Sequence, residues 1–91
     1  MKISVVVHSK DEGEDGKPCP YCRAAKAFLT EKGIPYTEKA HTWASRQELY
    51  DKLGLKDGQR TVPQVIIVDE DGVEYRVGGV RELRMYGIES L

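Results

Sequence analysis

The sequence contains two cysteines, Cys19 and Cys22, which are separated by Pro20 and Tyr21. A disulfide across so short a loop would constrain the unfolded chain very little, so it would stabilise the fold poorly. Such a bond can instead be made and broken readily. In a reducing compartment a Cys-x-x-Cys pair typically serves redox chemistry or metal binding. The spacing therefore predicts a redox-active dithiol or a metal site.

The two cysteines are expected to have different roles. Pro20 suits the first position of a helix, which places Cys19 at or beside the N-cap. Free N–H groups and the positive end of the helix dipole stabilise an anion there, and this lowers the pKa of the Cys19 thiol. Cys19 is therefore the candidate nucleophile. Cys22 would lie inside the first turn, where it can attack a mixed disulfide on Cys19 as the resolving thiol.

A metal site is the alternative use of these cysteines. With His8 and His41 they could in principle form a Cys2His2 zinc site. The two histidines lack the His-x3–5-His spacing of such sites, so we expect no metal ligands here. His8 is interpreted instead as a partly buried residue at the end of a strand, in preference to a catalytic base.

The composition is that of one small globular domain spanning residues 1–91. The chain is 40% apolar and 32% charged, which excludes the disordered and collagen-like classes. Its net charge of −1 offers no basic field, so we expect no nucleic-acid partner. The longest apolar runs fall far short of the ~20 residues of a membrane helix, and no signal-peptide pattern is present. We therefore expect a cytoplasmic protein that is monomeric and does not bind membranes.

Four strands and three helices must position the cysteines. β-branched runs predict strands at 3–8, 35–39, 64–68 and 73–77, and helical patterns cover 20–32, the segment from the capping box 45–48 to Gly54, and 80–86. A helical crossover makes the first two strands parallel, whereas Asp71-Gly72 predicts a hairpin between the last two. The order βαβαββα favours an α/β fold, with a four-stranded mixed sheet and helices on both faces.

Two segments outside these elements are also interpreted. The loop 9–18 contains Asp11, Glu12, Glu14 and Asp15, and we expect a solvated, mobile turn there. Trp43 precedes the capping box and is expected to pack the second helix against the body of the protein.

Two further motifs could bind a ligand. Thr61-Val62-Pro63-Gln64 enters a strand, and a cis Val62-Pro63 bond would leave the Val62 backbone free to pair with an extended, peptide-like ligand. Gly78-Gly79 precedes the last helix, where backbone N–H groups could meet a carboxylate.

From Ile3 to Tyr86 the chain resembles the glutaredoxins in three motifs of matching order and spacing. These are Cys19-Pro20-Tyr21-Cys22, Gly58-Gln59-Arg60-Thr61-Val62-Pro63 and Gly78-Gly79. The resemblance implies a thioredoxin-like fold, a cis Val62-Pro63 bond and glutathione-dependent reduction of protein disulfides and glutathione mixed disulfides. It also implies glutathione as reductant without a permanently bound cofactor, and ribonucleotide reductase as a family-level substrate.

The resemblance also assigns residues. It implies Cys19 as nucleophile and Cys22 as resolving cysteine. The chain departs from the family pattern at two places. Many glutaredoxins have a basic residue at the position of Gly16, and the nearest basic residue here is Lys17. After the two glycines the family often has x-Asp-Asp, whereas this chain has Val80-Arg81-Glu82. The long acidic loop suggests a phage-like or otherwise divergent branch. The residues assigned to glutathione are Lys17, Tyr21, Gln59, Val62, Pro63, Gly79, Val80 and Arg81.

Two other functions stay open at this point. Arg81 is compatible with a glutaredoxin-shaped electron donor that is recharged by thioredoxin reductase. The Cys-x-x-Cys spacing is also compatible with a metal or iron–sulfur binding module.

Overall fold

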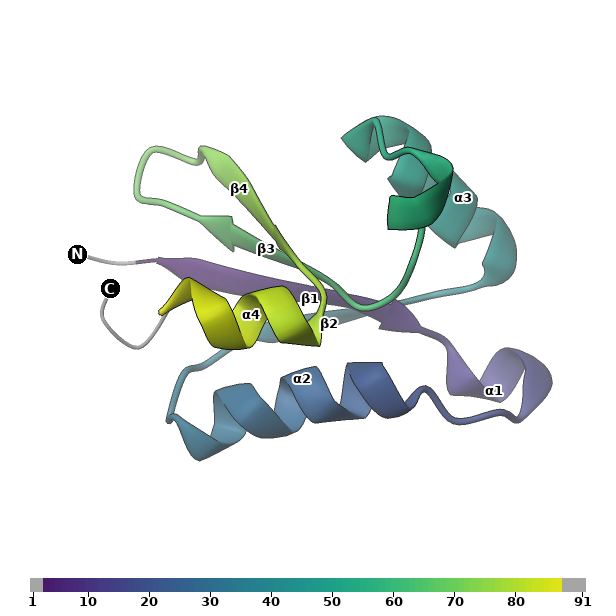
Figure 1. Ribbon diagram of the computed structural model, residues 1–91, viewed down its shortest axis with the longest axis horizontal. Helices are drawn as coiled ribbons and strands as arrows, with labels where there is room; N and C mark the ends of the chain where they lie inside the picture. Colours follow the sequence, from purple (N-terminus) through teal and green to yellow (C-terminus); the bar gives the residue numbers. More distant parts are fainter. Residues whose placement is uncertain (1–2, 88–91) are drawn as a thin grey trace.

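The fold is a four-stranded mixed sheet with helices on both faces (Figure 1). The computed structural model describes residues 3–87. The strand order is β2-β1-β3-β4, with β1 parallel to β2 and antiparallel to β3, and β3 antiparallel to β4. Along the chain the elements are β1 (Ser4–Lys10), α1 (Glu12–Asp15), α2 (Pro20–Glu31), β2 (Thr37–His41), α3 (Trp43–Leu53), the 3-10 turn η1 (Asp57–Gln59), β3 (Gln64–Val68), β4 (Glu74–Gly78) and α4 (Val80–Tyr86).

The main core lies between the sheet and the pair α2 and α4. Alternate residues of the central strands face it, with Val5 opposite Ile67 and Val7 opposite Val65. Leu29 of α2 and Leu83 of α4 are completely buried against them. The intervening residues of β1 and β3 face α3 on the other side of the sheet. α2 and α4 pack against each other on one face of the sheet, and both helices begin near the same end of the sheet (Figure 1).

The predicted order of the main elements is confirmed, and several boundaries differ. β3 and α4 have the predicted bounds. α2 ends at Glu31, one residue before the predicted end, and Gly33 has a positive φ of 69°. β1 continues beyond His8 because Ser9 and Lys10 pair with the end of β2, which itself begins at Thr37. β4 starts and ends one residue later than predicted. The structure also contains a fourth α-helix, α1, in the segment predicted as a mobile turn.

α1 is ordered by its own polar groups, which corrects the interpretation of the acidic loop. The Asp11 carboxylate caps the helix by accepting from Gly13 N at 2.9 Å. Asp15 accepts from Lys10 Nζ at 2.7 Å and from Lys17 N at 3.0 Å. The segment predicted as a loop therefore contains a short helix whose acidic side chains bond to neighbours, while residues 13–18 are exposed to solvent as predicted.

The start of α3 also differs from the prediction. The helix begins at Trp43 with Thr42 as N-cap, whose Oγ1 accepts from Ser45 N at 3.3 Å. Ser45, the predicted cap, lies inside the first turn, and its hydroxyl is 2.5 Å from His41 Nδ1. Trp43 is 64% exposed. The expectation that Trp43 packs the helix against the body is wrong, because the helix starts earlier and turns this ring outward.

A histidine pair joins β1, β2 and α3. His8 Nδ1 lies 2.8 Å from His41 Nε2, and both rings are partly buried. Burial, the neighbouring His41 and Lys39 lower the pKa of His8 to about 4, with Lys52 acting in the same direction and Glu74 against it. The pKa of His41 is also lowered, by burial and by Lys39 and Arg46. Both rings are therefore neutral in the folded protein near pH 7.

Acid is expected to destabilise the fold through His8. Between pH 6.5 and about 4 the unfolded chain binds a proton at this ring and the folded chain does not, so the free energy of unfolding falls as the pH falls. We expect a loss of about 1 kcal/mol between pH 7 and pH 5, after allowing for solvent screening of the half-buried ring. Urea unfolding at the two pH values measures it. His8→Asn keeps a polar group near Nδ1 and should reduce the loss; an equal loss in this variant would contradict the assignment.

Candidate active site

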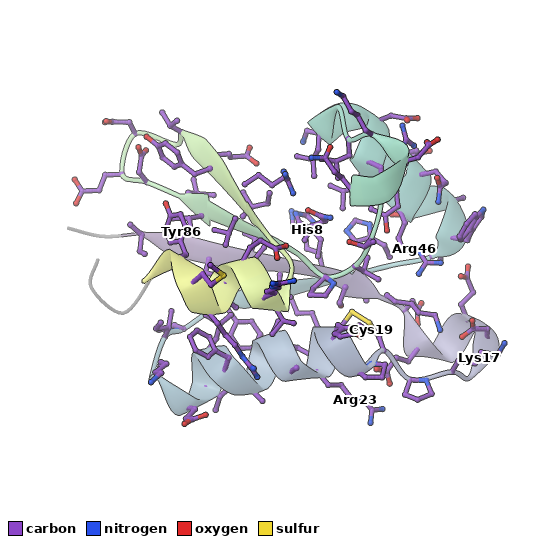
Figure 2. The ribbon with its side chains drawn as sticks, viewed as in Figure 1. His8, Lys17, Cys19, Arg23, Arg46 and Tyr86 are labelled. Atoms are coloured by element: carbon purple, nitrogen blue, oxygen red, sulfur yellow. A yellow bond between two sulfur atoms is a disulfide. The ribbon has the colours of Figure 1, made fainter. Side chains whose placement is uncertain are left out.

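The two cysteines form a disulfide in the first turn of α2 (Figure 2). Cys19 is the N-cap residue, with an extended backbone (φ −111°, ψ 92°), and Pro20 occupies the first helical position, as predicted. The Cys19 carbonyl accepts the first helical hydrogen bond, from Arg23 N at 3.0 Å. Cys19 is 6% exposed and Cys22 1% exposed. Of the two sulfur-bearing residues, the one at the helix end is therefore the more accessible to a substrate.

A groove lies between the start of α2, the Val62-Pro63 loop and the start of α4. Its volume is about 230 Å³ and its walls are mostly apolar. The Val62-Pro63 peptide bond is cis, as the resemblance implied. Tyr21, which lies between the cysteines in sequence and is 66% exposed, forms part of the wall. Six predicted glutathione residues line this groove, namely Tyr21, Val62, Pro63, Gly79, Val80 and Arg81, together with Thr61 and Glu82, which the sequence did not assign.

The turn before α4 forms one end of the groove. Gly78 has a φ of 115°, and a Cβ there would lie 3.0 Å from Glu82 Oε1, so both backbone conformation and space favour glycine. Glu82 Oε1 accepts from Gly79 N at 3.0 Å. The backbone N–H of Gly79, expected to be free for a ligand carboxylate, is therefore already bonded within the protein. A ligand would meet the N–H of Val80 first.

Two of the predicted glutathione residues lie outside the groove. Gln59 lines a neighbouring polar cavity of about 270 Å³, which shares Thr61, Gly79 and Glu82 with the groove. Its side chain accepts from Lys56 N at 3.1 Å. Lys17 lies at the outer end of the α1 turn, beyond Cys19 (Figure 2). The structure thus brings Gln59 close to the groove and leaves Lys17 apart from it.

Sequence reasoning missed two charged residues beside Cys19. Glu12 Oε2, on α1, accepts from Cys19 N at 3.0 Å and from Arg23 Nε at 3.0 Å. Arg23 Nη2 also donates to Glu12 Oε1, at 2.5 Å. The Arg23 guanidinium and the Cys19 N–H lower the pKa of Glu12 to about 2. The sequence pattern gives no signal for this contact. Glu12 lies on α1, which contains no buried residue and therefore shows no hydrophobic period.

Within residues 3–87 no group of three or more His, Cys, Asp and Glu side chains could hold a metal ion. Of the helices described there, none is both long enough and apolar enough to cross a membrane.

Fold and site together define a thioredoxin-like protein with a Cys-x-x-Cys disulfide at the start of a helix, next to a cis-proline loop. The sequence profile described as Glutaredoxin matches residues 5–73. The chain belongs to the glutaredoxin family, whose members are thiol–disulfide oxidoreductases.

Similarity to individual proteins agrees with membership in the glutaredoxin family. A glutaredoxin from Pseudomonas aeruginosa is 40% identical over 65 residues, which cover 71% of this chain and 69% of that protein. N-acetyl-S-hydroxy-L-cysteine reductase from Bacillus subtilis is 36% identical over 89 residues, or 98% of this chain and 80% of that protein. Glutaredoxin 1 of Rickettsia conorii is 39% identical over 49 residues, and the match spans 54% of this chain and about half (48%) of that protein.

A solved structure shows the same architecture over nearly the whole chain. The crystal structure of glutaredoxin 1 from Francisella tularensis complexed with cacodylate superposes with a TM-score of 0.71 at 27% identity. The superposition covers 98% of this chain and 96% of that one.

Proposed function

We propose that this protein is a dithiol oxidoreductase that reduces protein disulfides and glutathione mixed disulfides with electrons from glutathione. The observation that carries the proposal is the groove lined by Tyr21, the residue that lies between the two cysteines in sequence. Its mostly apolar walls, the backbone of Val62 before the cis proline and the start of α4 suit an extended peptide-like ligand with a carboxylate at one end.

The proposed reaction has two halves. The Cys19 thiolate attacks one sulfur of the substrate disulfide and forms a mixed disulfide, while the other sulfur leaves as a thiolate. Cys22 then attacks Cys19 Sγ, releases the second substrate thiol and forms the Cys19–Cys22 disulfide. One glutathione thiolate reopens this bond at Cys19 and frees Cys22. A second attacks the bound glutathione sulfur, so that oxidised glutathione leaves and the Cys19 thiolate returns.

The choice of reductant is tested by coupled assays. The purified protein is incubated with a mixed disulfide of glutathione and a small thiol, in the presence of NADPH, glutathione and glutathione reductase. We expect NADPH consumption that depends on the protein. A parallel reaction contains thioredoxin reductase in place of the glutathione system, and reduction only in that reaction would favour the alternative electron donor.

We further propose that the protein is a monomer in the cytoplasm and that ribonucleotide reductase is among its disulfide substrates. Pull-down and reductase assays can test the proposed substrate.

Small-molecule sulfenic acids are a second candidate substrate class. The supporting observation is that the Bacillus subtilis reductase named for such a substrate aligns with 98% of this chain. The Cys19 thiolate would attack the sulfenic sulfur and expel hydroxide, which takes up a proton as water, and Cys22 would release the reduced thiol. Rates with N-acetyl-S-hydroxy-cysteine and with the glutathione mixed disulfide, at equal concentrations, decide which class is preferred.

Arg81 is expected to weaken the use of glutathione. Its exposed guanidinium lines the groove at the start of α4, where it attracts a ligand carboxylate and repels the neighbouring α-ammonium of glutathione. Arg81→Asp should lower the KM for glutathione several-fold, because an aspartate there attracts the ammonium group. Titration of the Cys19 thiol should stay almost unchanged.

The control for this change is Arg84→Asp, which makes the same charge change on an exposed residue of α4 outside the groove. We expect its KM to stay near that of the parent. An unchanged or higher KM for Arg81→Asp in steady-state assays would contradict the prediction.

A further inference from the structure

The N-terminus of α2 lacks the acidic residue that commonly completes a helix cap. In a capping box, a Glu or Gln at the third helical position accepts the N–H of the N-cap residue. In α2 that third position is Cys22, the resolving cysteine, and the N-cap is Cys19. The first turn of α2 therefore has no Glu or Gln that could accept a hydrogen bond from the Cys19 N–H.

α1 supplies the missing acceptor. Glu12 Oε2 lies 3.0 Å from Cys19 N, so a carboxylate from a separate helix takes the place of the capping glutamate. α1 is itself fixed at several points, since Asp11 caps it, Asp15 bonds to Lys10, and Glu14 accepts from Trp43 N at 2.9 Å. Glu12 is thus held against the end of α2 by the whole α1 turn.

A carboxylate in this place has an electrostatic cost for a nucleophilic thiolate. Its negative charge, close to Cys19, opposes ionisation of the thiol. Arg23 bonds to both Glu12 oxygens and brings one positive charge to the same place. The Glu12–Arg23 pair is therefore neutral as a whole, and Glu12 stays ionised wherever a thiolate could form, since its pKa is about 2.

Two further ion pairs lie around this pair, while Lys17 and Glu14 form no ion pair with a described residue. On the side of β2, Lys26 of α2 bonds to Glu38, which also accepts from Ser9 of β1. On the side of α1, Asp15 bonds to Lys10 and to the backbone N–H of Lys17. Removing one member of the Glu12–Arg23 pair is consequently the change that leaves an uncompensated charge next to Cys19.

We propose that Glu12 is a positioning residue that fixes the backbone of the nucleophile, and that Arg23 cancels its charge so that the Cys19 thiol still ionises readily. The inference rests on the proposed role of Cys19 as the nucleophile. It does not depend on which reductant or substrate the protein uses.

The electrostatic part is tested by titrating Cys19 alone, in a Cys22→Ser background, by ultraviolet absorbance of the thiolate. Glu12→Gln keeps an acceptor for the Cys19 N–H and leaves the guanidinium unbalanced, so the titration midpoint should fall by about half a pH unit. Arg23→Gln leaves the carboxylate unbalanced, and the midpoint should rise by about the same amount. The double variant should return to the parent value.

Glu31→Gln is the matched control, because it makes the same change of a carboxylate to an amide on an exposed residue at the opposite end of α2 from Cys19. Its midpoint should stay near the parent value. Shifts of Glu12→Gln and Arg23→Gln in the same direction, no shift in either, or an equal shift in Glu31→Gln would overturn the electrostatic part. These titrations contain no glutathione, so they stand apart from any failure of the coupled assays.

The positioning part is tested by hydrogen exchange of the Cys19 amide in the oxidised protein. Glu12→Ala removes the acceptor, and the Cys19 amide proton should exchange at least about tenfold faster. Glu12→Gln retains an acceptor and should restore slow exchange. Equal exchange rates in the parent and in Glu12→Ala would overturn the assignment of Glu12 as a positioning residue.

Discussion

Cys19→Ser is expected to abolish disulfide exchange with every substrate. Serine at the N-cap preserves the helix end, because its hydroxyl is itself a good cap, but it cannot form the mixed disulfide. Activity in the coupled assay should fall to the uncatalysed rate, while circular dichroism and the urea midpoint should stay close to those of the parent with reduced cysteines. The measurement therefore separates loss of the nucleophile from loss of the fold.

Cys22→Ser provides the matched comparison, since it removes the other sulfur from the same turn. Reduction of glutathione mixed disulfides should persist, because glutathione itself can resolve the intermediate on Cys19. Reduction of protein disulfides that need the second thiol should fall strongly. Equal loss of both activities in the two variants would refute the division of roles between the cysteines.

Leu83→Ala is expected to cause a large loss of stability. Leu83 is completely buried, and it is the buried residue of the short helix α4. Truncating it leaves a cavity in the core shared with α2, at a cost of about 3 kcal/mol, out of a total near 5–15 kcal/mol for a domain of this kind. Because α4 forms one wall of the groove, the KM for glutathione should also rise. Urea unfolding followed by circular dichroism, together with steady-state kinetics, measures both effects.

Met85→Ala is the control on the same helix. Its side chain is 79% exposed, so the free energy of unfolding should change by less than about 0.5 kcal/mol. If Leu83→Ala were as mild as this control, the burial of α4 would not be the interaction that fixes it to the sheet.

The regular elements could be predicted because their signals are local. β3 is a short run made mostly of β-branched residues, and α4 begins after two glycines and ends at Tyr86, before Gly87, so the sequence predicts both with the observed bounds. Pro20 at the first helical position likewise placed Cys19 at the N-cap. In these elements the local preference and the tertiary packing favour the same conformation.

The errors occur where polar side-chain contacts, which leave no hydrophobic period in the sequence, decide the structure. α1 buries no residue, so it shows no hydrophobic period, and its order depends on bonds to Lys10, Arg23 and Trp43. At α3 two capping patterns overlap, one starting at Thr42 and one at Ser45. The Ser45 hydroxyl contacts His41, four residues earlier, and the capping pattern alone does not show that this hydroxyl has a partner other than the helix end.

The candidate site was predicted mainly through the resemblance to glutaredoxins. Val62, Pro63 and Gly79 come from segments far apart in sequence, and a pattern alone does not show that they share a groove with Tyr21. The bond between Glu82 and the Gly79 N–H was not predicted, because it depends on the turn at Gly78.

The exposed position of Trp43 makes the protein's intrinsic fluorescence a local signal. Trp43 is the single tryptophan of the chain. Its backbone N–H donates to Glu14 of α1, and the Arg46 guanidinium lies 5.2 Å from the ring centre. Because the ring is already in water, its emission wavelength should change little when the whole chain unfolds. Emission intensity will instead report on the junction of α1 and α3, one short helix away from the reactive sulfur.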